Sequence, residues 1–185
     1  MEIDKVIQSS IVDGEEVLWC GKPQKKCYVW GAVLKMLPIA LIWLLVDGGF
    51  IIGLLASGAF SETPYMAYFL VPFFLFHLMP VWIWIGSIIK ASAGYKKIIY
   101  CITSERIIIK QGLILSDMRS VLLTEIDSVN LKEGFLDKIF KTGDIYCVGK
   151  MQGVSFNDVE NVETVYATLN QAVMKAKDLI KEKGE

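Results

Sequence analysis

MLPIALIWLLVDGGFIIGLLASGAFS, residues 36–61, and TPYMAYFLVPFFLFHLMPVWIWIGSII, residues 63–89, are two long stretches almost without charge. The first holds one charged residue, Asp47, and the second holds none, although it contains the only histidine of the chain, His77. A helix of about 20 apolar residues spans the hydrocarbon core of a bilayer and satisfies its own backbone hydrogen bonds there. The two stretches therefore predict a transmembrane hairpin within residues 33–90, with spans at about 36–58 and 67–89.

Basic residues flank this hairpin on one side only. Seven lysines lie near the outer ends of the two spans: Lys22, Lys25, Lys26, Lys35, Lys90, Lys96 and Lys97. The connecting loop, roughly residues 56–67, contains neither lysine nor arginine. Because basic residues next to a span are retained in the cytoplasm, the asymmetry predicts two spans with both chain termini cytoplasmic.

The charge balance of the remaining chain is that of an ordinary globular domain. Overall 54% of the residues are hydrophobic and 21% are charged, with a formal net charge of −1. Residues 90–185 carry 14 Lys and Arg against 13 Asp and Glu. Nucleic-acid binding domains instead concentrate basic residues, so no nucleic-acid partner is expected.

The cysteines indicate neither a disulfide nor a metal site. Cys20, Cys27, Cys101 and Cys147 are scattered and form no C-x-x-C pair. All four are predicted to face a reducing compartment, where disulfides are rare. Since the single histidine lies inside a span, the spacing does not suggest zinc ligands, and we expect no metal and no cofactor.

After the hairpin the apolar pattern changes from continuous runs to short segments typical of antiparallel strands. These segments are residues 95–102, 106–115, 120–124, 126–131 and 144–148. A helix capped by Asn157 or Asp158 is predicted to follow, because apolar residues then recur at helical spacing. We expect residues 91–185 to form a cytoplasmic α+β domain, separate from an N-terminal cytoplasmic segment, residues 1–32.

Several local motifs resemble those of a known family. They are DGEEVLW at 13–19, GKP at 21–23, YCITSERI at 100–107, GL at 112–113, LTEIDSV at 123–129 and GFLDKIFKTGDI at 134–145. Their order resembles that of the bacterial pleckstrin-homology (PH) domain membrane proteins of the YdbS/YdbT type. The resemblance implies a seven-stranded, partly open antiparallel β-barrel capped by a C-terminal helix, held by the two-helix hairpin at the inner face of a bacterial or archaeal plasma membrane.

The same resemblance argues against specific phosphoinositide binding. PH domains that bind phosphoinositides share a basic cluster in the first loop between strands. We interpret the tight turn at Ser104 and Glu105 as the corresponding loop, and it lacks such a cluster.

Two sets of residues inside the hairpin are candidate functional positions. Asp47 and His77 lie at similar predicted depth, where an ionisable residue is costly and marks either a proton or ion path or a structural hydrogen bond across the hairpin. Gly49, Gly53 and Ser57 form a row of small residues. Such a row allows close approach of the second span or of another copy of the chain.

Candidate contacts with lipid or a partner protein lie in the segment between residues 132 and 150. They are Lys132, Phe135, Lys138, Phe140, Lys141 and Lys150. Lysines near an anionic membrane surface contribute about 1 kcal/mol each. The alternative interpretation is a solvated surface whose aromatic residues close the barrel, because acidic residues interrupt the lysines.

No catalytic motif is recognisable. G-x-S-x-G, P-loop and H-E-x-x-H patterns are absent from the sequence, and the only histidine is in a predicted span, so we expect no enzymatic activity. We predict a membrane-anchored PH-like binding or scaffold module that recruits an unknown protein partner or contacts the lipid bilayer. The alternatives are a transport or channel component using Asp47 and His77, which requires a homo-oligomer, and an accessory subunit of a membrane complex.

Overall fold

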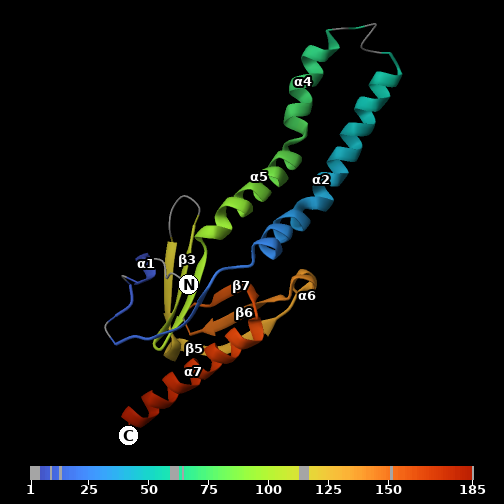
Figure 1. Ribbon diagram of the computed structural model, residues 1–185. Helices are drawn as coiled ribbons and strands as arrows, with labels where there is room; N and C mark the ends of the chain where they lie inside the picture. The colour runs from blue at the N-terminus through green and yellow to red at the C-terminus, as the bar shows by residue number, and fades with distance from the viewer. Residues whose placement is uncertain are drawn as a thin grey trace. The chain divides into compact units, whose positions relative to one another are not determined.

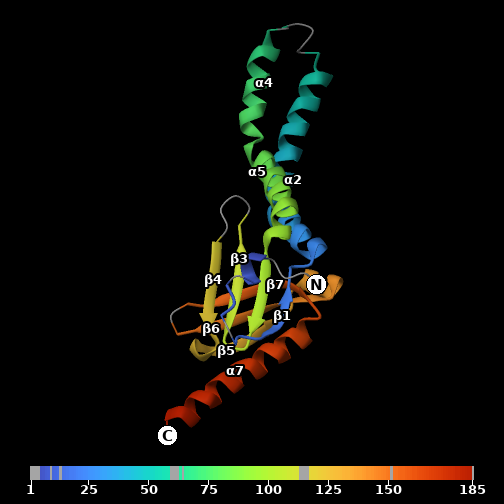
Figure 2. The same cartoon turned by 60° about the vertical axis from the view of Figure 1, so that its left-hand side comes forward.

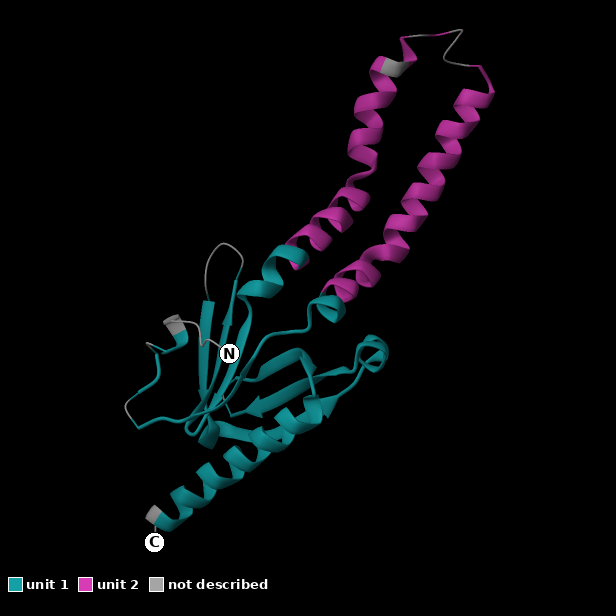
Figure 3. Cartoon of the chain, in the orientation of Figure 1, with its two compact units in different colours: residues 1–28, 92–185 teal, residues 29–91 magenta. Residues whose placement is uncertain are grey.

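The computed structural model describes residues 5–8, 10–12, 14–58, 63, 65–112, 117–150 and 152–184. The chain divides into two compact units (Figure 3). Unit 1 comprises residues 1–28 and 92–185, and unit 2 comprises residues 29–91. Residues on both sides of the hairpin in the sequence therefore belong to the same unit.

Unit 1 contains two antiparallel sheets (Figure 1). The first has the order β1 (Val17–Gly21), β2 (Ile99–Thr103), β3 (Arg106–Gln111) and β4 (Asp117–Leu122). The second has the order β5 (Ile126–Lys132), β6 (Thr142–Gly149) and β7 (Val154–Glu160). The described residues thus supply the seven strands expected, but these form two sheets, and the expected partly open barrel is not observed.

In the sequence, the hairpin lies between two neighbouring strands of the first sheet. Strand β1 ends at Gly21, which pairs with Tyr100 in β2, and all of unit 2 lies between these two residues in the sequence. The first connection between strands is therefore the hairpin itself. The turn at Ser104 and Glu105 joins β2 to β3, so its interpretation as the first loop was wrong.

The predicted C-terminal helix is α7 (Val162–Gly184), and it begins later than expected. Asn157 does not start the helix, because β7 continues to Glu160, which pairs with Thr142. Asp158 and Asn161 have φ angles of 55° and 50°, in the left-handed region where a right-handed helix cannot run. The strand therefore extends over the residues that looked like a helix cap.

The main core of unit 1 lies between the sheets and α7. Phe156 is fully buried and stacks on Tyr100, with ring centroids 4.9 Å apart. The apolar stripe predicted for the helix is buried as far as Ala176, whereas Ile180 is 55% exposed. In Figures 1 and 2 the last turns of α7 run past the end of the sheets, which explains this change.

A smaller apolar cluster lies beneath α1 (Lys5–Gln8). Ile7 packs there with Ile99, Cys101 and Ile108. Cys101 is also bonded to Cys20, its partner in the β1–β2 register. The expectation of no disulfide was therefore wrong. The two cysteines are 81 residues apart in sequence and become neighbours only when β1 pairs across the hairpin.

Unit 2 contains most of α2 (Lys25–Ala56) together with α4 (Met66–His77) and most of α5 (Met79–Gly94). Among the described helices, only α2 is by itself long and apolar enough to cross a membrane. Helices α4 and α5 qualify only together, as one span bent by 51°. Pro80 lacks a backbone N–H and its ring crowds the carbonyl of Phe76, which accounts for a break at Leu78.

The remaining elements of unit 1 are short. They are the 3₁₀ turns η1 (Tyr95–Lys97) and η2 (Leu123–Glu125) and the helix α6 (Phe135–Phe140) between β5 and β6.

Candidate functional site

Asp47 and His77 meet across the hairpin. The Oδ1 atom of Asp47 lies 2.8 Å from Nδ1 of His77, and the rings of Trp43 and Phe73 flank the imidazole. Asp47 is only 3% exposed, whereas the side chain of His77 is 40% exposed. The other carboxylate oxygen, Oδ2, is buried and has no hydrogen-bond partner among the described residues. The pair thus forms one hydrogen-bonded contact, and the second carboxylate oxygen of Asp47 has no described partner.

The row of small residues on α2 lies on an exposed surface. Gly49, Gly53 and Ser57 are all exposed, and a Cβ atom added at either glycine would meet no described atom within 4 Å. Ser57 donates its hydroxyl hydrogen bond to the carbonyl of Leu54 in its own helix, at 2.9 Å. The row is therefore not used for close packing within the described hairpin. Close approach of a second copy stays a prediction.

The lipid or partner candidates divide into two places. Lys132, Lys138 and Lys141 are exposed in or beside α6, together with Phe135, whereas Phe140 is half-buried. Lys150 follows the opposite end of β6, because the β5–β6 register pairs Lys132 with Asp144 and Ile126 with Gly149. The structure therefore assembles one group of candidates around α6 and leaves Lys150 outside it.

The buried carboxylate of Asp137 organises α6. Its Oδ2 atom accepts a hydrogen bond from the Gly134 N–H at 2.7 Å, which caps the helix. Its Oδ1 atom accepts one from the Thr142 hydroxyl at 2.9 Å and one from the Cys27 thiol at 3.5 Å. The Gln24 side-chain amide also donates to the carbonyl of Phe140, at 3.4 Å. These contacts attach α6 to the first turn of α2.

The role of Asp137 was not anticipated from the sequence. The available signal was its position three residues after Gly134, the N-cap to N3 spacing of a capping box. Its contact with Cys27 had no local signal, because 110 residues separate the two.

Cys27, Asp137 and Asp158 form the described cluster that could hold a metal ion, with ligand atoms within 4.8 Å of one another. Both oxygens of Asp137 already accept hydrogen bonds from protein donors. Burial raises the pKa of Asp158, which disfavours its charged, metal-binding form. The arrangement fits a hydrogen-bonded helix cap better than a cation site.

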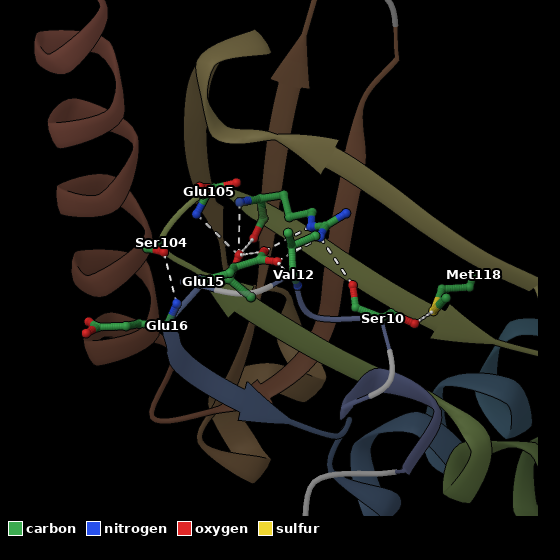
Figure 4. A network of polar contacts seen from close by, with 9 residues as sticks. Ser10, Val12, Glu15, Glu16, Ser104, Glu105 and Met118 are labelled. Atoms are coloured by element: carbon green, nitrogen blue, oxygen red, sulfur yellow. Dashed lines mark hydrogen bonds and ion pairs between the residues drawn. The ribbon is translucent and has the colours of Figure 1, made fainter.

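A second buried carboxylate, Glu15, joins the N-terminal segment to the β2–β3 turn (Figure 4). Arg106 donates from Nε to Oε1 at 2.9 Å and from Nη2 to Oε2 at 2.7 Å. The Thr103 hydroxyl and the Val12 N–H also donate to this carboxylate, at 2.6 and 3.0 Å. The Arg106 hydrogen bonds are the main cause that lowers the pKa of Glu15 to about 2, against the opposing effect of burial.

Glu15 and Arg106 both belong to motifs that suggested the family, although their contact was not anticipated. The model of the bacterial PH domain family matches residues 34–173, which is more than half of the chain. The chain belongs to the bacterial PH domain family. The match begins inside α2, so β1 of this bacterial PH domain protein precedes it. No curated protein and no solved structure matches the chain.

The PH domain also carries a groove between β1, the β2–β3 turn and α7. It has a volume of about 400 Å³. Leu18, Glu105, Lys175 and Leu179 are among the residues that line it. Leu18 and Leu179 are 43% and 48% exposed, so the groove offers apolar surface between opposite charges. None of the candidate contact residues named from the sequence lines this groove, although the turn at Ser104 and Glu105 does.

Proposed function

We propose that this bacterial PH domain protein is a membrane-anchored, non-enzymatic binding or scaffold module at the cytoplasmic face of the plasma membrane. In this role the PH domain recruits a protein partner or contacts lipid. The observation that carries the proposal is the insertion of the hairpin between the paired strands β1 and β2. Two chain connections then hold the domain at its anchor, which raises its effective concentration for any partner at the membrane.

The flanking lysines support the cytoplasmic assignment. The outer ends of the two spans carry all seven lysines close to the hairpin, and the loop between the spans carries no basic residue. A cysteine in place of Thr63, in that loop, is therefore expected to react with an impermeant thiol reagent in intact cells. A cysteine in place of Lys181, in α7, should react only after permeabilisation, and the reverse pattern would overturn the topology.

Photo-crosslinking in native membranes tests the binding role. Benzoylphenylalanine in place of Leu179, in the groove beside α7, should give an adduct with another polypeptide. The same residue in place of Val148 on β6, which is similarly exposed, serves as the matched control. The adduct should weaken in a Leu18→Glu variant. Equal labelling at Leu179 and Val148, unchanged by Leu18→Glu, would contradict recruitment through this groove.

A second candidate function is an oligomeric transport or channel component. It is favoured by the Oδ2 atom of Asp47, which has no hydrogen-bond partner among the described residues, and by the exposed Gly49–Gly53–Ser57 row. Benzoylphenylalanine in place of Phe76, which is 81% exposed on α4, should then give a ladder of self-adducts. Asp47→Asn should abolish proton flux in that case. An Asp47→Asn protein with unchanged flux and assembly would exclude the transport role.

A further inference from the structure

Helix α6 presents an apolar surface that unit 1 does not cover. Phe135 is 78% exposed, more than any other large apolar residue described in this unit, and Ile139 is 56% exposed. The two residues are four positions apart, so they lie on the same face of the helix. Leu136, by contrast, is half-buried. The sequence thus places two large apolar side chains where packing of the domain does not require them.

Exposed lysines lie in and beside the same helix. Lys138 lies within α6, Lys141 follows its last residue and Lys132 ends the preceding strand β5. Two acidic residues interrupt the sequence here, but Asp137 is buried and bonded internally, so Glu133 is the exposed one. An exposed apolar pair with lysines close to it in the sequence is complementary to an anionic bilayer surface, which offers phosphate groups above an apolar layer.

The contacts of α6 link it to the start of α2, within unit 1. Helix α2 has 32 residues. At about 1.5 Å per residue it is about 48 Å long, close to the roughly 40–45 Å thickness of a bilayer with its headgroup layers. The first turn of α2 therefore belongs at a headgroup layer. Cys27 and Gln24, at the start of this helix, are the residues that contact Asp137 and Phe140 of α6.

We infer that α6 docks on the anionic cytoplasmic surface of the bilayer, with Phe135 and Ile139 inserted at the interface and Lys132, Lys138 and Lys141 contacting lipid phosphates. The inference rests on the proposed membrane anchoring and names lipid as the partner of this surface. It leaves the groove beside α7 available for a protein.

The test uses the full-length protein in lipid nanodiscs. Benzoylphenylalanine replaces Phe135, and lipid adducts are quantified by mass spectrometry in discs of phosphatidylglycerol and in discs of phosphatidylcholine. We expect at least about fivefold more adduct in the anionic discs, because headgroup charge attracts the lysines. The same residue at Val148, on β6, should give little lipid adduct in either disc.

Charge variants make the test specific. The triple variant Lys132→Gln, Lys138→Gln, Lys141→Gln should lower the Phe135 adduct in anionic discs to the level in neutral discs. The matched variant Lys150→Gln, Lys175→Gln, Lys181→Gln removes the same charge elsewhere and should leave the adduct unchanged. The inference would be overturned if the two triple variants lowered the lipid adduct equally. It would also be overturned if Phe135 gave no more lipid adduct than Val148.

A crosslinker at Phe76 distinguishes failure of this inference from failure of the anchoring. Lipid adducts at Phe76 without any at Phe135 would leave the membrane anchor intact and exclude docking of α6. Absence of lipid adducts at both positions would contradict the anchor itself. In native membranes, an adduct of Phe135 with another polypeptide in place of lipid would also overturn the inference.

Discussion

The thiol of Cys27, in the first turn of α2, lies 3.5 Å from Oδ1 of Asp137 in α6. This contact joins the beginning of the long apolar helix to a short helix between two strands of the PH domain. The Asp137 carboxylate also accepts a hydrogen bond from the Gly134 N–H, which caps α6, and another from the Thr142 hydroxyl. One carboxylate therefore contributes both to the conformation of α6 and to its attachment to α2.

Asp137→Ala should destabilise the protein strongly for a residue outside the apolar core. The variant removes the cap of α6, worth about 1 kcal/mol, and leaves the buried Thr142 hydroxyl and Cys27 thiol without this acceptor, which adds about 1–3 kcal/mol. The measurement is the free energy of unfolding in detergent micelles. Cys27→Ala, which removes only the weak thiol hydrogen bond and a small volume, should cost less. A larger loss for Cys27→Ala would contradict the central role of the carboxylate.

The Glu15–Arg106 pair should make stability depend on pH. The folded-state pKa of Glu15 is lowered from 4.5 to about 2, so its ionised form stabilises the folded chain fully above about pH 4.5. This contribution is lost as the pH falls through the range from about 4.5 to about 2. Glu15→Gln should lower the melting temperature at neutral pH, and the difference from the unchanged protein should shrink on acidification.

Arg106→Met is the partner experiment for the same ion pair. It leaves the Glu15 carboxylate buried without its cation, and breaking a buried pair in this way costs about 3–5 kcal/mol. The combined Glu15→Gln, Arg106→Met variant should be more stable than Arg106→Met alone. If the two substitutions instead add independently in thermal unfolding, the residues do not act as a pair.

The disulfide predicts a specific count of free thiols. Cys20 and Cys101 are bonded, whereas Cys27 and Cys147 are free and buried. Alkylation of protein denatured without reductant should therefore modify two cysteines, and reduction before alkylation should raise the number to four. Mass spectrometry of the intact chain distinguishes these outcomes. Four modified cysteines without reductant would show that the pair is reduced in the isolated protein.

Asp47 and His77 should be energetically coupled. Because a polar group in the bilayer benefits from a partner, Asp47→Ala or His77→Ala alone should each cost about 1–2 kcal/mol of unfolding free energy in mixed micelles. The double variant should cost less than the sum of the two. Strict additivity would show that the 2.8 Å contact contributes little to the hairpin.

The long apolar stretches, the lysine asymmetry and the apolar stripe of α7 could be interpreted from sequence because each depends on local composition or spacing. The position of Pro80 was also a local signal for a helix break, although the bend at Leu78 was not predicted from it. Strands were harder to assign at their ends. Residues 157–160 have the polar character of a helix cap, and pairing with β6 decides in favour of strand.

The sequence by itself determined that this protein has one or two candidate membrane spans, a β-rich domain and a final amphipathic helix. Only the tertiary structure decided that β1 pairs with β2 across the hairpin, that Cys20 meets Cys101, that Arg106 meets Glu15 and that Cys27 meets Asp137. The physical reason is the range of the interactions. Helix periodicity and membrane insertion depend on neighbouring residues, whereas these contacts join residues some 80 to 110 positions apart, and their energy appears only once the chain has folded to bring them together.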